Sequence, residues 1–165
     1  MKKIETKFQC RCGKIQITAI GKPITSVVCY CDDCQNGGKL LNELSSENKV
    51  SDMQGGTPYV LFRKDKIIYD FDKNLLKGLK LKSSSPTNRN YSACCLTPMF
   101  INFDDNKHWI DFYALNALDV IPKPEMRICT KFKTGPLNNE LPNYKNFSLH
   151  FISKLIFAKF QMWFF

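Results

Sequence analysis

The stretch Cys29-Tyr30-Cys31-Asp32-Asp33-Cys34 brings three thiols together within six residues, directly after the short, β-branched segment that begins at Ile24. Three thiolates can hold a tetrahedral Zn²⁺ and leave its fourth position free for water or a substrate thiolate. A C-x-x-C pair can instead form a dithiol redox site. Because this cluster holds a third cysteine, we interpret it as a metal site at the end of a strand.

Composition indicates a globular chain. Its 165 residues fit one domain, and 44% hydrophobic and 13% aromatic residues exclude a largely disordered protein. The formal charge of +9 would attract anions, but bound zinc thiolates would lower it. The lysines are spread along the sequence and no nucleic-acid-binding motif is present, so nucleic acid is not an expected partner.

Cysteine usage depends on the compartment. The start of the chain, Met1 to Lys7, lacks the apolar run of a secretory signal, which predicts a cytoplasmic protein. In a reducing cytoplasm the eight cysteines are expected to bind metal or to react, and not to form disulfides.

Hydrophobic patterning predicts a mainly β fold. Alternating or β-branched segments predict strands, and the charged turn at residues 63–66 predicts a hairpin between two of them. Between residues 35 and 56 only Lys39 to Leu44 resembles a helix. Residues 109–118 are ambiguous between a strand and a helix. Four prolines make residues 122–142 mostly irregular. The expected strands cover residues 8–20, 24–30, 59–62, 67–71, 77–82 and 99–103.

The C-terminal segment, Phe147 to Phe165, is apolar but carries several polar residues, so it is a poor transmembrane span. We expect a helix packed on the core. The alternative is a helix that rests on a membrane or a partner.

Two further cysteine groups lie far from the first. Cys10-Arg11-Cys12-Gly13 sets two thiols on one side of an extended backbone, and its glycine permits a turn toward a metal. Cys94 and Cys95 precede the apolar segment at residues 99–103.

Other candidates have weaker patterns. Cys129 lies outside every motif and reads as a small buried residue, and His108 and His150 have no partner at ligand spacing. Asp32 and Asp33 could orient an amine or accept a proton, or could simply be solvated. The loop Gly55-Gly56-Thr57 could offer amides to a carboxylate, or could be only a turn.

The three cysteine groups together resemble the glutathione-dependent formaldehyde-activating enzyme family, which includes centromere protein V-like proteins. The shared motifs are Cys10-Arg11-Cys12-Gly13, Cys29-Tyr30-Cys31-Asp32-Asp33-Cys34-Gln35 and Cys95-Leu96-Thr97-Pro98, and the resemblance covers roughly residues 5 to 120. It implies twisted β-sheets in a tent-like zinc-binding fold, with residues 121–165 as an extension of a single domain, 1–165.

The resemblance also implies two zinc ions. Cys10, Cys12 and Cys95 would hold a structural zinc, and the cluster Cys29, Cys31 and Cys34 would hold a catalytic one. The third motif departs from the family pattern C-x-x-C-G-T-P, because Ser92 stands where its first cysteine belongs and Leu96 stands where its glycine belongs. Cys94 could replace the missing ligand, but neighbouring residues on an extended chain face opposite ways, so this requires a bent backbone.

We therefore expect a zinc-dependent carbon–sulfur lyase-like protein that acts on an adduct of glutathione or another thiol. The alternative is a zinc-stabilised interaction module without turnover, whose basic surface meets an acidic partner. Ser92 and Leu96, at the two departures from the pattern, keep this alternative open.

Overall fold

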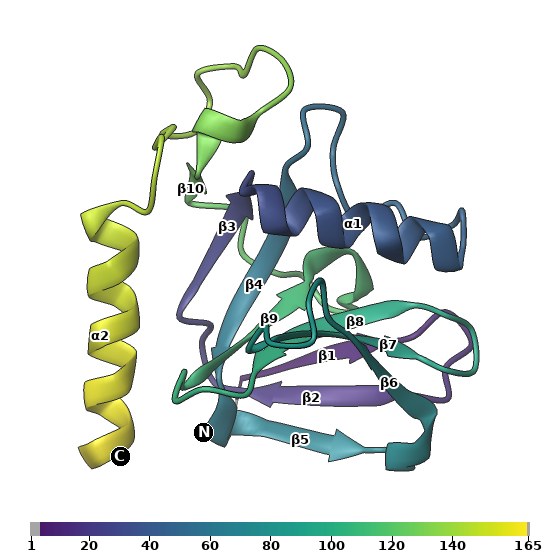
Figure 1. Cartoon of the computed structure of the whole chain (residues 1–165). Helices are drawn as coiled ribbons and strands as arrows, with labels where there is room; N and C mark the ends of the chain where they lie inside the picture. The colour runs from purple at the N-terminus through teal and green to yellow at the C-terminus, as the bar shows by residue number, and fades with distance from the viewer. Residues whose placement is uncertain (1–3, 165) are drawn as a thin grey trace.

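The described part of the chain folds into two β-sheets and two α-helices (Figure 1). The structure is a computed structural model, and it describes residues 4–164. Short 3₁₀ turns lie at Lys64–Lys66, Lys73–Leu75, Ala114–Asn116 and Thr130–Phe132. The strands and helices are β1 (Glu5–Gln9), β2 (Gln16–Ile20), β3 (Thr25–Cys29), α1 (Asp32–Leu44), β4 (Thr57–Arg63), β5 (Ile67–Asp70), β6 (Leu76–Leu79), β7 (Thr87–Ser92), β8 (Pro98–Phe103), β9 (Trp109–Tyr113), β10 (Met126–Ile128) and α2 (Leu149–Phe164).

The larger sheet has the strand order β10-β3-β4-β9-β8-β7-β6, and the smaller sheet has the order β1-β2-β5. All pairs are antiparallel except β10 with β3, which run parallel. The predictions of a mainly β fold and a C-terminal helix are confirmed. The ambiguous segment after residue 109 is a strand followed by a 3₁₀ turn, and the proline-rich segment is irregular apart from β10.

The single strand predicted from Phe8 to Ile20 is wrong in its middle. β1 and β2 form a hairpin whose register runs from Glu5 opposite Ile20 to Gln9 opposite Gln16. The chain reverses between them at Gly13, whose φ of +79° is a left-handed conformation that glycine adopts without strain. The buried apolar positions change from even numbers, at Phe8 and Cys10, to odd numbers, at Ile15 and Ile17, and this change of phase marks the reversal.

The hairpin predicted around residues 63–66 is also wrong, although both of its strands exist. β4 pairs with β3 and β9 in the larger sheet, whereas β5 pairs with β2 in the smaller one. The 3₁₀ turn at Lys64–Lys66 carries the chain from one sheet to the other. A charged turn between two strands therefore cannot show whether the strands pair with each other.

Helix α1 starts seven residues earlier than the turn predicted at Lys39 to Leu44. Cys31 caps its N-terminus, because its sulfur accepts a hydrogen bond from the backbone N–H of Cys34. Asp32 and Asp33 add negative charge to the first turn, where the helix dipole favours it. The glycines that follow conceal this helix from propensity alone.

Strand β4 shows how the larger sheet divides the interior. Val60 and Phe62 point to one core cluster, whereas Tyr59 and Leu61 point to the other, as the two-residue period of a strand requires. All four side chains are at most 3% exposed. Burying each contributes about 1.5–3 kcal/mol to stability, so β4 anchors both faces of the sheet.

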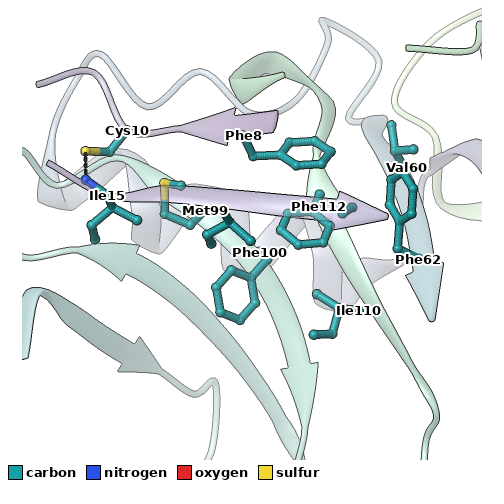
Figure 2. Packing of buried hydrophobic residues seen from close by; sticks show 11 residues of the cluster. Phe8, Cys10, Ile15, Val60, Phe62, Met99, Phe100, Ile110 and Phe112 are labelled. Atoms are coloured by element: carbon teal, nitrogen blue, oxygen red, sulfur yellow. Dashed lines mark hydrogen bonds between the residues drawn. The ribbon is translucent and has the colours of Figure 1, made fainter. Parts of the chain in front are cut away.

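One core lies between the two sheets (Figure 2). Phe8 from β1 stacks on Phe112 from β9 with ring centroids 4.2 Å apart, and Phe62 meets both rings edge-on. Cys10 lies at the end of this core, where its sulfur accepts a hydrogen bond from the backbone N–H of Ile15 at 3.3 Å (Figure 2). The sheet packing thus fixes the turn that carries the first cysteine pair.

The opposite face of the larger sheet carries the second core, to which α1 contributes Leu41 and α2 contributes Phe151. Helix α2 stands beside β3 in Figure 1, and the carbonyl of Leu155 bonds the ring of His108 at 2.8 Å. The predicted packing on the core holds for only one side of α2. Most of its large apolar side chains, including Ile156, are exposed. Among residues 4–164 no helix is long and apolar enough to span a membrane, and Phe165 lies outside the described residues.

Candidate functional site

The first cysteine group lies where two hairpin turns meet. Cys10 and Cys12 belong to the turn between β1 and β2, and Cys94 and Cys95 belong to the turn between β7 and β8. The four sulfurs all lie within 4.8 Å of one another. Arg11 ties the turns together by donating to the carbonyl oxygen of Cys95 at 2.7 Å. Residues more than 80 positions apart in the sequence therefore form one compact tetrad.

The spacing of these sulfurs fits a tetrahedral metal. Zn–S bonds of about 2.3 Å place the sulfurs about 3.8 Å apart. The sulfur of Cys10 lies 3.6 Å from that of Cys12 and 3.9 Å from that of Cys94, and Cys12 lies 3.2 Å from Cys94. Four thiols at this spacing could supply all four ligands of one tetrahedral metal ion.

The turn shows how Cys94 enters the tetrad. Leu96, at the family's glycine position, adopts a left-handed φ of +58°, which costs a residue with a side chain about 1–2 kcal/mol. The bend itself lies at Ala93–Cys95, where the N–H of Leu96 bonds the carbonyl oxygen of Ser92 at 2.8 Å, and there the sulfurs of the adjacent Cys94 and Cys95 both reach the group. Ser92 instead bonds inside the turn: its hydroxyl lies 3.2 Å from the sulfur of Cys95 and accepts from the N–H of Thr97 at 2.9 Å.

The second cysteine group is built by the junction of β3 and α1. Cys29 ends β3, Cys31 caps α1, and Cys34 lies in the first helical turn, so the three sulfurs come within 4.8 Å of one another. The hydroxyl of Tyr59 on β4 lies 3.6 Å from the sulfur of Cys34. Three thiols can supply three of the four ligands of a tetrahedral metal.

Electrostatics in this cluster favour a thiolate at Cys31. Hydrogen bonds from the Cys29 and Cys34 thiols, the N–H at the helix start and the nearby charge of Arg89 hold the pKa of Cys31 well below its usual value. The neighbouring thiols of Cys129, Cys31 and Cys34, together with burial, raise the pKa of Cys29. A divalent cation would allow the remaining thiols to ionise as well.

Cys129 lies beside this second group, which its isolated position in the sequence did not predict. Parallel pairing of β10 with β3 places Ile128 opposite Cys29, so the thiol of the next residue, Cys129, lies near enough to raise the pKa of Cys29. Cys129 is 5% exposed, as expected of a buried residue. Its sulfur is not one of the three that lie within 4.8 Å of one another.

A cavity of about 210 Å³ opens next to the second group, and Cys29, Cys31 and Cys34 form part of its wall. Most of the remaining wall is apolar. Any ligand of a metal held by these thiols could enter from this side. The pocket therefore supplies what a reactive metal site needs, namely space beside an incomplete ligand set.

Two ionisable side chains, which the sequence did not single out, also line the pocket. Arg89 on β7 is 2% exposed and donates to the carbonyl of Asp33 at 2.8 Å, but its Nε and Nη1 have no partner among the described residues. It packs so closely under α1 that a Cβ at Gly37 would lie 1.9 Å from Nε. This fixed cation offsets negative charge on the thiolates.

Asp111 on β9 is the second such group. Its Oδ1 is buried without a hydrogen-bond partner in the described part of the chain. Desolvation raises the pKa of its carboxyl to about 7. A carboxyl that titrates near neutral pH can both hold and release a proton.

The weaker candidates lie elsewhere. His108 bonds the backbone of α2, and His150 is exposed near Glu125. Gly55 and Gly56 pack against the side chains of Gln35 and Tyr30. None of these residues belongs to either cysteine group. Of the two adjacent aspartates, only Asp33 lines the pocket.

Comparison with known proteins agrees with these features. The family described as glutathione-dependent formaldehyde-activating enzyme matches residues 5–130, which extends the expected range by ten residues to include β10 and Cys129. A crystal structure of a Rhodobacter sphaeroides protein matches with a TM-score of 0.49 and 12% identity, covering 70% of this chain and 91% of that one. No curated protein sequence matches the chain. The family match covers more than half of the sequence, and the chain therefore belongs to the glutathione-dependent formaldehyde-activating enzyme family.

Proposed function

We propose that this protein is a zinc-dependent carbon–sulfur lyase that acts on the adduct of a thiol, such as glutathione, with a small carbonyl compound. The observation that carries the proposal is the three-cysteine group in the wall of a pocket. Family membership supports the same chemistry. Free thiols at all eight cysteines suit a reducing compartment such as the cytoplasm.

The two cysteine groups have different roles in this proposal. Cys10, Cys12, Cys94 and Cys95 hold a structural zinc, because four sulfurs complete its ligand set. Cys29, Cys31 and Cys34 hold the second zinc and leave one position for the substrate sulfur. When bound there, zinc supplies a Lewis acid that keeps a thiol ionised near neutral pH.

The protein's own groups handle charge and protons around that sulfur. In the synthetic direction the thiolate forms a bond to the carbonyl carbon, and the oxygen that becomes an alkoxide takes up the proton which the thiol lost. Asp111 lines the same pocket and, with its pKa near 7, accepts the proton of the thiol and gives it to this oxygen. The reverse sequence cleaves the carbon–sulfur bond. Arg89 stays in place and balances the thiolate charge.

Cobalt substitution tests this function. The Co²⁺-loaded chain should change its visible spectrum when a thiol reaches millimolar concentration, because a new thiolate joins the metal. Cys31→Ser should abolish this change, whereas Cys129→Ser, as the matched control beside the site, should keep it. A spectrum that no thiol alters, with two metals still bound, would favour the zinc-stabilised interaction module instead.

A further inference from the structure

The pocket beside the three-cysteine group has mostly apolar walls. Leu61 from β4, Ile101 and Phe103 from β8, and Trp109 from β9 supply apolar surface from the larger sheet. The cavity of about 210 Å³ is smaller than the roughly 300–1,000 Å³ typical of sites for drug-sized ligands. A compact ligand with an apolar body matches both its size and its surface.

The C-terminal extension completes this wall. Phe147 and Phe151 line the pocket, although they lie beyond the family-matched residues 5–130. Their rings stack with centroids 5.7 Å apart. Ser148 fixes their position, because its hydroxyl accepts from the N–H of Phe151 at 3.0 Å and donates to the sulfur of Met126 at 3.3 Å. A segment outside the family core therefore shapes the space next to the proposed metal.

Charged groups at the pocket suit a multiply charged ligand poorly. The unpartnered Nε and Nη1 atoms of Arg89 are buried with less than 1 Å² of accessible surface each, so a ligand cannot reach them. Lys107 is paired with Asp105 and lies over the ring of Phe103, with its Nζ 4.7 Å from the centroid. Asp111, also in the wall, would repel a carboxylate when ionised.

Glutathione carries two carboxylates and one ammonium group. Burying an unpaired charge costs several kcal/mol, and the apolar wall offers these groups few partners. An aromatic or branched aliphatic body would instead replace water against Phe147, Phe151 and the sheet residues. Only the sulfur end of such a molecule needs a polar partner, and the cysteine group provides it.

Resting on the proposed function, we infer that the site takes a thiol, or its carbonyl adduct, with a compact apolar body in preference to glutathione, and that Phe147 and Phe151 determine this preference.

The test compares three thiol probes on the Co²⁺-loaded full chain: phenylmethanethiol, 2-mercaptoethanol and glutathione. Half-saturation of the spectral change, corrected for the ionisation of each thiol, should occur for phenylmethanethiol at a concentration at least about tenfold lower than for glutathione.

Single variants separate specificity from metal binding. Phe147→Ala removes a side chain that is 56% exposed, so the fold should survive. The variant should weaken phenylmethanethiol about fivefold to tenfold and leave 2-mercaptoethanol unchanged. Phe157→Ala is the matched control, because Phe157 is 62% exposed on α2 and lies outside this pocket. Phe151→Ala, a buried change, serves as a second variant once its folding is verified by circular dichroism.

The outcomes are distinguishable. Equal or tighter binding of glutathione, or an unchanged phenylmethanethiol response in Phe147→Ala, would overturn the inference and leave the lyase proposal standing. A cobalt spectrum that responds to none of the three thiols, including the small 2-mercaptoethanol, would overturn the proposed function, and the inference would fall with it.

Discussion

Replacing Asp111 by Asn should remove a pH-dependent destabilisation of the folded chain. Burial raises the pKa of the Asp111 carboxyl from 3.8 to about 7. Because the folded state holds this proton more tightly than the unfolded state, stability falls as the pH rises from 3.8 to about 7. At about 1.36 kcal/mol per pH unit the penalty is at most about 4 kcal/mol above pH 7, and partial exposure of the residue lowers this ceiling.

Urea unfolding at pH 6 and pH 8, with the metal content held constant, measures the effect. The stability gained by Asp111→Asn should be larger at pH 8 than at pH 6, by up to about 1.4 kcal/mol. Asp104→Asn is the control, because Lys80 holds the pKa of the Asp104 carboxyl below its usual value and this group does not titrate between pH 6 and 8.

Two results would refute this reasoning. A gain that is equal at the two pH values would mean that the Asp111 carboxyl has already ionised below pH 6. A loss of stability at pH 8 would mean that the charged carboxylate has a stabilising partner in the folded protein. Either result would also remove the proton donor from the proposed chemistry.

Further substitutions test the metal groups and the packing beneath α1. Cys94→Ser should release one metal equivalent and lower the unfolding free energy by about 3 kcal/mol or more. Ser92→Ala loses only hydrogen bonds and should keep both metals. Elemental analysis measures the metal content of both variants, and urea titration measures their stability. Cys31→Ser should also release one equivalent, but the far-ultraviolet circular dichroism spectrum should stay unchanged. Gly37→Ala should destabilise the protein by about 1–3 kcal/mol in place of the usual gain from alanine in a helix, because the new Cβ would collide with Arg89; an unchanged urea midpoint would contradict the packing.

Local patterns predicted much of the fold. Alternation and β-branching indicated most strands, and the apolar tail indicated α2. The errors fall where partners are distant: β5 follows β4 along the chain but pairs with β2. Helix α1 was missed in part because its start depends on a thiol cap at Cys31, which propensity scales do not include. The single-domain organisation stays a prediction.

The cysteine groups were predictable because ligand spacing is encoded locally, whereas the pocket was not. Arg89 and Asp111 lie on strands β7 and β9, in stretches without a motif, and only sheet order brings them near Cys31. Cys129 reaches Cys29 by parallel pairing across about 100 residues, for which the sequence carries no local signal. The position of Cys94 depends on the turn at Ala93–Cys95, a stretch without a glycine or proline to indicate a bend.

The most direct test is an elemental assay of protein purified without chelators, expressed per mole of chain. Two equivalents of zinc are expected, one for the four sulfurs at Cys10, Cys12, Cys94 and Cys95 and one for the three at Cys29, Cys31 and Cys34. A preparation that is folded and reduced, yet contains no transition metal, would contradict both assignments.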